Sequence, residues 1–337
     1  MRASWPDPDD IRACRAALRV GSSSFHTAGL LLPAQVRDHA SALYAFCRVA
    51  DDIADGGGGN DRIDALRVRL EAAYAGRPRN SPVDRAFAAV VALHGVPREV
   101  PEALLEGLAW DVAGRDYETL ADLEAYAARV AGTVGVMMAL VMGVRDAGAL
   151  ARAADLGVAM QFTNIARDVG EDARMGRIYL PRQWLREAGV APESLLQNAA
   201  WSPALSRVVA RLLGVAEGLY ARASGGISHL PFGCRTGIHA ARCIYAEIGR
   251  MITLEGVDPL RQRAVVPLRR KMSLVARASV AALLPQSAGD GPPLEATRFL
   301  VSAATAAATP DRAGAGEGRI VWLLALFERL ERQSARA

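Results

Sequence analysis

The chain has 337 residues, 51% of them hydrophobic, which is enough for one large helical domain or two small ones with a sizeable core. Its 23% of charged residues leave a formal net charge of only +4, and the lack of a Lys/Arg block argues against a nucleic-acid partner. Four cysteines without a Cys-x-x-Cys spacing argue against a disulfide framework or a zinc site and favour a reduced compartment.

The fold is predicted to be all-α, because apolar residues recur at three and four positions and almost no segment alternates with period two. The Pro/Gly-rich stretch at 285–293 suggests a boundary between a main domain over 1–285 and a helical extension over 286–337 of open role. Helices are expected near 8–19, 34–55, 61–75, 82–94, 98–113, 119–143, 147–173, 203–229, 237–256 and 262–284.

Neither the N-terminal residues nor the longest uncharged apolar run predicts a transmembrane segment. Residues 1–14 contain no apolar signal-peptide core, and the apolar run from Val130 to Val144 is too short to span a bilayer. We therefore expect a cytoplasmic protein that is either soluble or peripheral on the inner face of the cell membrane.

The first polar motif is GSSSF at 21–25, ahead of an apolar, helix-like run. The hydroxyl groups of Ser22 and Ser24 are suited either to capping a helix or to donating to phosphate oxygens. Ala28 and Gly29 lie one turn further on, where small side chains would leave depth in a cavity for a long apolar tail. Packing against a neighbouring helix explains the same small pair equally well.

A stripe of polar residues marks the helix expected at 34–55. Tyr44, Arg48, Asp51 and Asp55 are spaced 0, 4, 7 and 11, and Asp52 lies beside them. Four glycines at 56–59 then end the helix. One Asp-x-x-x-Asp helix is a weak signal, so this stripe gains meaning only from a second one elsewhere in the chain.

The helix expected at 119–143 is rich in small residues. The glycines of YAARVAGTVG, at 126–135, would let another helix or a long flat ligand approach the backbone closely. Within two turns of Gly135, an apolar group is suited to line a dry cavity or to form ordinary core: Met137, Met138, Leu140 and Val141.

The second stripe lies on the helix expected at 147–173 and consists of Gly157, Gln161, Asn164, Asp168 and Asp172. These positions stay within roughly an 80° arc of a helix. An outer, solvated face usually carries Lys and Glu, whereas this one carries amides and Asp. The composition therefore favours a helix that faces a wet cavity over a solvated outer face.

Two matched stripes far apart in sequence predict carboxylates that face each other across a helix bundle. Converging carboxylates repel unless cations neutralise them, and all-oxygen ligation suits Mg²⁺ or Mn²⁺. Because Mg²⁺ shares its shell with phosphate oxygens, the implied substrate is a phosphate or diphosphate ester. A di-iron site would require Glu-x-x-His pairs, and none of the five histidines lies in either motif.

Basic residues follow the second stripe. Arg167 and Arg177 are the strongest candidates to neutralise charge on a leaving diphosphate, with Arg263 and Arg269 among the later bases. The last amphipathic helix, expected from Arg319 to Arg332, would either dock on the core or lie on a membrane.

Four motifs in this order resemble the squalene/phytoene synthase family. They are SSSF at 22–25, LYAFCRVADDIAD at 43–55, YAARVAGTVG at 126–135 and LGVAMQFTNIARDVGEDARMGRIYLP at 156–181, so the resemblance covers roughly residues 10–275. The chain departs from the family at Ala127, where members often have Cys, and in its glycine run at 56–59. Neither departure touches a carboxylate.

The resemblance implies an isoprenoid-synthase-type helical bundle around a central active-site cavity. It assigns metal and diphosphate binding to Asp51, Asp52, Asp55, Asp168 and Asp172, with Asn164 beside the metal and Tyr126 added to the catalytic set. It further assigns substrate contacts to Ser22, Ser24, Tyr44, Arg48, Gln161, Asn164, Arg167, Arg177, Tyr179 and Tyr245.

The activity implied is the Mg²⁺-dependent, head-to-head condensation of two geranylgeranyl diphosphates to phytoene, through prephytoene diphosphate and without NADPH. One alternative is a squalene or dehydrosqualene synthase that acts on farnesyl diphosphate, where squalene formation needs NADPH. An alternative of another class is a non-catalytic relative that binds lipid or a partner protein. The expected partners are isoprenoid diphosphates and, peripherally, a membrane.

Overall fold

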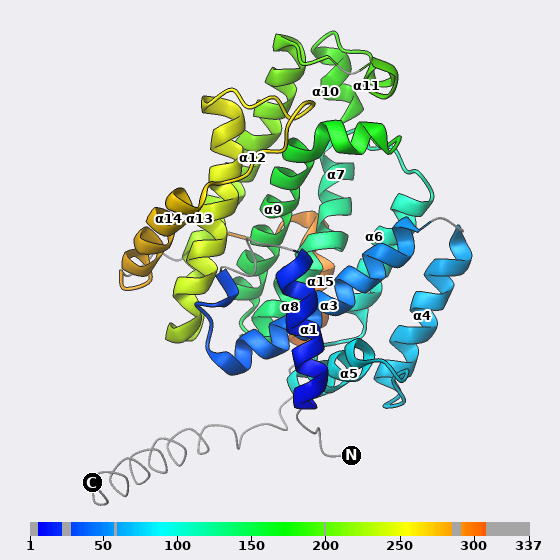
Figure 1. The fold of residues 1–337 in the computed structure, drawn as a ribbon, viewed down its shortest axis with the longest axis vertical. Helices are drawn as coiled ribbons and strands as arrows, with labels where there is room; N and C mark the ends of the chain where they lie inside the picture. The colour runs from blue at the N-terminus through cyan, green and yellow to red at the C-terminus, as the bar shows by residue number, and fades with distance from the viewer. Residues whose placement is uncertain (1–5, 22–27, 57–58, 199, 285–290, 308–337) are drawn as a thin grey trace, which may run out of the picture.

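The computed structural model describes residues 6–21, 28–56, 59–198, 200–284 and 291–307, and every regular element within them is helical (Figure 1). This confirms the all-α prediction. The first half of the chain forms α1 (Pro8–Gly21), α3 (Ala34–Asp55), α4 (Asn60–Tyr74), α5 (Pro82–His94), α6 (Glu99–Val112), α7 (Leu120–Ala127), the π-helix η1 (Ala128–Gly132) and α8 (Thr133–Val141).

The second half begins with the longest helix, α9 (Ala147–Arg174). It continues with α10 (Arg182–Glu187), α11 (Pro192–Asn198), α12 (Pro203–Ile227), α13 (Phe232–Leu254), α14 (Leu268–Ala281), the 3₁₀ turn η2 (Glu295–Thr297) and α15 (Arg298–Ala306). Sequence periodicity missed the short helices α10, α11 and α15, placed the start of α13 five residues late, at 237, and placed the start of α14 six residues early, at 262.

Helix α9 is the centre of the arrangement. It packs against α12 and α13 on one side and against η1 and α8 on the other, while α3 packs with α1, α5 and α6 (Figure 1). The two helices that carry the acidic stripes, α3 and α9, therefore belong to different parts of the bundle and are joined through α8. Side chains start some of these helices: Asp146 accepts a 2.8 Å hydrogen bond from the Ala149 amide at the start of α9.

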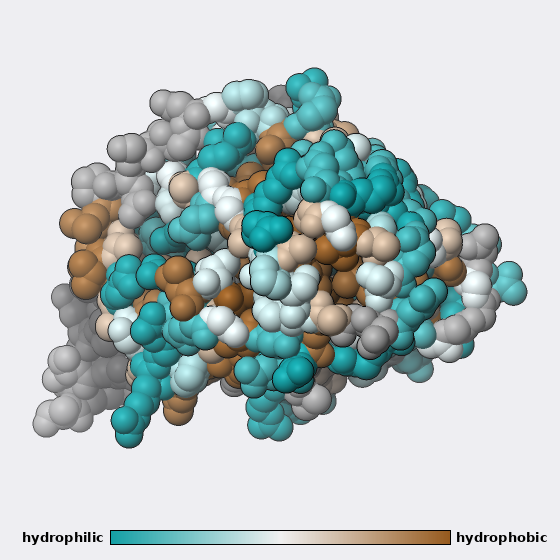
Figure 2. Space-filling view, turned by 90° about the horizontal axis from the view of Figure 1, so that it is seen from above, coloured by the Kyte–Doolittle hydropathy of each residue, from teal (hydrophilic) through white to brown (hydrophobic). Residues whose placement is uncertain are grey.

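Two apolar clusters form the core. The first surrounds α3, α5, α6 and α8, and in it the rings of Phe46 and Phe87 stack with centroids 3.7 Å apart. The second surrounds α9, α12 and α13, where Thr163 and the Tyr220 hydroxyl share a 2.9 Å hydrogen bond deep in the interior. The outer surface seen in Figure 2 is mainly hydrophilic, with apolar patches between charged side chains.

Glycines bring α9 into close contact with α8 and with η1. A Cβ atom added at Gly135 would lie 2.1 Å from the Ala153 carbonyl oxygen, and one at Gly157 would lie 2.2 Å from that of Ala131. Close helix packing therefore explains these two glycines. The continuous helix Leu120–Val141 is, at 22 residues, the one described helix long and apolar enough to cross a membrane, and 56% of its most apolar window is buried inside the protein.

The described part of the C-terminal region packs on the main bundle. Thr297 and Leu300 are fully buried, and α15 lies against α6, α8 and α9. The expected helix from Arg319 to Arg332 lies outside the described residues. All four cysteines are free thiols.

Candidate active site

A cavity of about 310 Å³ runs along α9. From α9 it is lined by Ala149, Arg152, Ala153, Leu156, Gly157, Met160, Gln161 and Asn164. Ala149 and Asn164 are fifteen positions apart, so at 1.5 Å per residue the part of α9 that lines the cavity is about 22 Å long. Tyr44, Gln161 and Asn164 mark its polar end, and most of the remaining wall is apolar.

The acidic stripe of α3 lies beyond this polar end and is held by arginines. Arg48 reaches Asp52 at 2.8 Å and Asp51 at 3.6 Å, all on the same helix. Arg177, which follows α9, donates to Asp55 at 2.9 Å. This last contact joins the end of α3 to the segment after α9, across 122 residues of sequence. The two stripes therefore meet in one site.

The stripe of α9 is held in a similar way. Asp168 accepts from Arg167 Nε at 2.8 Å and from Arg263 Nε at 3.0 Å, so two guanidinium groups share one carboxylate. Tyr245 lies close enough to Arg167 and Asp168 for their charges to act on its hydroxyl, although burial is the larger reason that the pKa of Tyr245 rises to about 12.

The electrostatics of Asp172 differ from those of Asp168. Burial first, and then the negative charges of Asp168 and Glu171, raise the pKa of Asp172 to about 8, against a smaller lowering by Arg177. Burial and the nearby Asp55 also raise the pKa of Asp51. Burial and mutual repulsion therefore oppose the charged form of both carboxyl groups, and Asp172 holds its proton at neutral pH.

Asp111 on α6 was not among the predicted site residues. Its carboxylate accepts hydrogen bonds from the Tyr126 hydroxyl at 2.8 Å and from the Tyr179 hydroxyl at 2.7 Å. Burial raises the pKa of Asp111 to about 6, although both tyrosines and Arg177 act in the opposite direction. The rings of Tyr126 and Tyr179 stack with centroids 5.1 Å apart, and Tyr117 packs against both.

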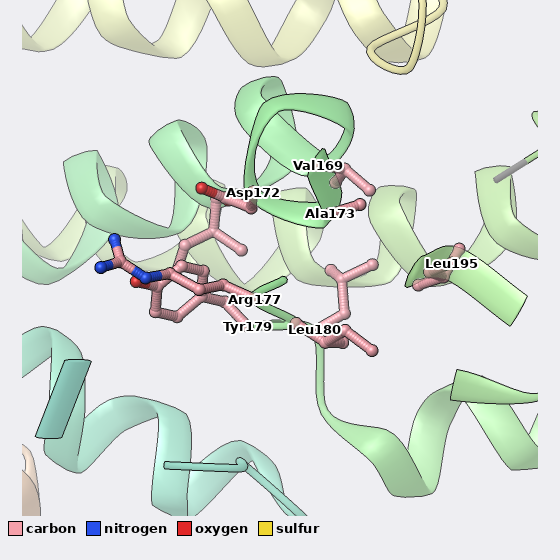
Figure 3. Close-up of a pocket in the computed structure, with 9 residues that line it drawn as sticks. Val169, Asp172, Ala173, Arg177, Tyr179, Leu180 and Leu195 are labelled. Carbon is pink, nitrogen blue, oxygen red and sulfur yellow. The ribbon is translucent and has the colours of Figure 1, made fainter. Parts of the chain in front are cut away.

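A recess of about 10 Å³ lies behind this cluster (Figure 3). Asp172, Arg177 and Tyr179 are at one end of it, and the apolar side chains of Val169, Leu180 and Leu195 are at the other. The recess is too small for a substrate. It separates the charged site from the packing between α9 and α11.

The donor set fits a hard divalent cation. Its potential ligands are carboxylate and amide oxygens, and a bound cation would offset the burial and the neighbouring carboxylates that raise the pKa values of Asp51 and Asp172. Within the described residues, no three acidic, His or Cys side chains lie close enough together to hold an ion by themselves. Mg²⁺ keeps several waters and binds one or two carboxylates together with substrate phosphates, so it needs no such cluster.

The structure brings most of the predicted site residues together. Tyr44, Gln161 and Asn164 line the cavity, and Arg48, Arg167 and Arg177 pair with the acidic stripes. Tyr126 and Tyr179 contact Asp111 and do not line the main cavity. Ser22 and Ser24 lie outside the described residues.

The structure divides the apolar group after Gly135, for which a cavity wall and ordinary core were both open, between these two roles. Met138 lines the cavity, whereas Met137, Leu140 and Val141 are buried in the core around α3 and α8. A helix can present only one face to a cavity, so a group of four near-consecutive residues cannot all line it. Ala28 and Gly29 do line the cavity, and a Cβ atom added at Gly29 would meet no atom within 4 Å.

Comparison with known proteins identifies relatives over most of the chain. The family model for squalene/phytoene synthase matches residues 18–270. A phytoene synthase from Rhodobacter capsulatus is 54% identical over 277 residues, which cover 81% of this chain and 82% of the relative. A phytoene synthase from Cereibacter sphaeroides is 49% identical over 343 aligned positions, which cover 97% of this chain and 96% of the relative.

Solved structures agree with the sequence relatives. The crystal structure of a dehydrosqualene synthase in complex with a ligand has a TM-score of 0.74 at 32% identity, covering 81% of this chain and 96% of that one. A squalene synthase from Alicyclobacillus acidocaldarius has a TM-score of 0.67 at 27% identity, covering 74% and 94%. The chain belongs to the squalene/phytoene synthase family.

Proposed function

We propose that this chain is a phytoene synthase, a prenyltransferase of carotenoid biosynthesis that condenses two geranylgeranyl diphosphates head to head and releases diphosphate. The observation that carries the proposal is the geometry of one site: two arginine-paired acidic stripes at the polar end of a deep apolar cavity. The relatives named phytoene synthase, at 45–54% identity, support the same activity.

The depth of the cavity supports a twenty-carbon substrate. An extended polypeptide advances about 3.3–3.6 Å over the three backbone bonds of one residue. At the same advance per bond, the four chain bonds of one isoprene unit span about 4.4–4.8 Å. Four units then need about 18–19 Å and three need about 14 Å. A cavity lined by about 22 Å of α9 is long enough for the four-unit tail, whereas a three-unit tail would leave its far end unfilled.

Each part of the site has a separate task. Arg167, Arg177 and Arg263 are placed to neutralise the charge that develops on a leaving diphosphate. The apolar wall keeps water from the allylic cation, so that the double bond of the second substrate captures it instead. Asp111 holds the Tyr126 and Tyr179 hydroxyls at the edge of the charged site.

Mg²⁺, with Mn²⁺ as a substitute, is the proposed cofactor. Asp51, Asp55, Asp168 and Asp172, with Asp52 and Asn164 beside them, would hold it together with the substrate. When bound, it would neutralise the diphosphate and make it a better leaving group. Proposed partners are isoprenoid diphosphates, and the proposed location is cytoplasmic with peripheral contact to the membrane.

Squalene or dehydrosqualene synthesis from farnesyl diphosphate remains the second candidate, because solved structures bearing those two names share the fold. Labelled geranylgeranyl and farnesyl diphosphates, each with and without Mg²⁺ and NADPH, separate the candidates. We expect a forty-carbon product from geranylgeranyl diphosphate that needs Mg²⁺ and not NADPH. A thirty-carbon product alone would select the second candidate, and no product from either would favour a non-catalytic relative.

A further inference from the structure

An exposed apolar surface lies at one corner of the molecule, outside the wall of the cavity. We define this apolar corner by five residues whose side chains face solvent: Leu30 (57% exposed), Phe232 (62%), Val280 (60%), Leu283 (70%) and Leu284 (58%). Exposed leucines at single positions are ordinary, but a group of large apolar side chains indicates a contact surface.

The residues of the corner come from three segments that lie together in space. Arg270 of α14 pairs with Glu247 of α13 at 2.6 Å, and the two helices run antiparallel (Figure 1). This register places the end of α14, at Leu283 and Leu284, beside the start of α13, at Phe232. The turn that holds Leu30 touches the same place, since a Cβ atom at Gly233 would lie 3.1 Å from Pro33.

The three segments of the corner carry basic side chains and no acidic ones. Residues 28–37, 227–240 and 271–284 contain no Asp or Glu, whereas they contribute the exposed Arg277 and the half-buried Arg235 to this surface. The acid that follows the first segment, Asp38, is paired with Arg15 at 2.6 Å. Apolar side chains accompanied by cations, in segments free of acids, are complementary to the surface of a bilayer that contains anionic lipids.

The corner is also the outer side of the cavity wall. In the turn before α3, Leu30 faces outward while Gly29 and Leu32 line the cavity, and Gly237 and Ile238 line it from α13. Apolar surface also reaches the left edge of Figure 2, the side on which Figure 1 places α14. The thickness of one chain segment therefore separates the apolar cavity from the apolar corner.

We propose that the apolar corner docks this protein on a membrane surface containing anionic lipids and directs the apolar end of the cavity toward the lipid. The functional part of this inference rests on the proposed function, because a forty-carbon hydrocarbon product is insoluble in water and has to be delivered to lipid. The docking itself depends only on the surface chemistry of the corner. It assigns membrane contact to α13, α14 and the turn at 28–33.

Flotation of the full chain with phosphatidylcholine vesicles, with and without phosphatidylglycerol, tests the docking. We expect the wild type to float with the anionic vesicles and to bind less at high salt, where charge is screened. Leu283→Glu with Leu284→Glu should weaken binding at least about tenfold, because two charges replace inserted apolar side chains. Arg277→Ser should weaken it less, by about fivefold, as expected for one cation at the surface.

Two matched controls identify the corner as the cause. Val68→Glu changes a side chain on α4 that is 59% exposed, close to the 58% of Leu284. Arg77→Ser removes an exposed cation outside the three segments of the corner. Both variants should float like the wild type. The Leu283→Glu/Leu284→Glu protein should keep its circular dichroism and its turnover of detergent-dispersed substrate, because neither residue lies in the site.

Three results would overturn the proposal. The first is a wild type that floats with no vesicle, which would exclude docking on lipid. The second is unchanged flotation of the Leu283→Glu/Leu284→Glu protein, which would assign lipid contact to another part of the chain such as 319–332. The third is a dimer in light scattering that the same substitutions dissociate, which would assign the corner to a second copy. Failure of the proposed function would appear separately, in the product assay.

Discussion

Replacing Asp172 with Asn tests the electrostatics of the site, because this carboxyl group is held in an environment that opposes its charge. Its pKa rises from 3.8 to about 8, through burial and the charges of Asp168 and Glu171. Between these two pH values the folded protein holds a proton that the unfolded chain has lost. The free energy of unfolding therefore falls as pH rises through this window. In Asp172→Asn the side chain cannot lose a proton, so this decrease in stability does not occur.

The magnitude follows from the pKa change. A rise from 3.8 to about 8 corresponds to an upper limit of about 6 kcal/mol above pH 8. Asp172 is partly exposed, so water and salt reduce this figure, and we expect a gain of about 1–2 kcal/mol at pH 8.5. The gain should shrink toward pH 5 and vanish below about pH 4, where both states of the wild type are protonated.

Urea unfolding in metal-free buffer at several pH values measures this gain. Asp168→Asn is the matched control, because Asp168 lies one turn away on α9 but accepts from both Arg167 and Arg263. That variant should lose stability or stay level, since it weakens two charge-assisted pairs. Both variants should lose product formation. A gain for Asp172→Asn that is equal at pH 5 and pH 8.5, or no gain at all, would refute the reasoning.

Three further predictions concern catalysis. A chelator should abolish product formation and Mg²⁺ or Mn²⁺ should restore it; full turnover in metal-free buffer would contradict a metal-assisted ionisation. Gly29→Phe should lower kcat/KM for geranylgeranyl diphosphate about 10–100-fold and much less for farnesyl diphosphate, because the ring enters open cavity space and overlaps only the longer tail; equal losses would show that Gly29 does not limit tail length. Asp111→Asn should lower kcat with little change in KM, and it should remove any fall in wild-type activity below about pH 6, where the Asp111 carboxylate becomes protonated; an unchanged pH–rate profile would exclude this role.

Much of the site could be predicted from the sequence because it is built from helical stripes. The period of 3.6 residues places Tyr44, Arg48, Asp51 and Asp55 on one face of α3 whatever the rest of the chain does. The same rule puts Gln161 and Asn164 on the face of α9 that lines the cavity. Helix boundaries were accurate where a helix was long and its ends carried proline, glycine or a capping side chain, as at Pro82.

The parts that were missed depend on contacts between distant segments. Asp111 lies 15 residues before Tyr126 and 68 before Tyr179, so no local spacing links it to either hydroxyl. Arg263 lies 95 residues after Asp168, so the sequence offered it only as one of several later bases and gave no reason to pair it with that carboxylate. The short helices α10, α11 and α15 have too few turns for a period to be visible, and tertiary packing stabilises them.

The balance of charges explains why a diphosphate should not bind this site alone. Four carboxylates, from Asp51, Asp52, Asp55 and Asp168, face four guanidinium groups, from Arg48, Arg167, Arg177 and Arg263, while Asp172, whose pKa is about 8, holds its proton at neutral pH. The ligand-free site is therefore close to neutral, and a bare diphosphate would have to pull arginines from their carboxylates and leave those carboxylates unpaired. When a diphosphate binds together with divalent cations, the carboxylates bind the metal in place of the arginines. The released arginines then bind the phosphate oxygens. The arginine pairs of the ligand-free site therefore keep it assembled, and they make substrate binding and metal binding depend on each other.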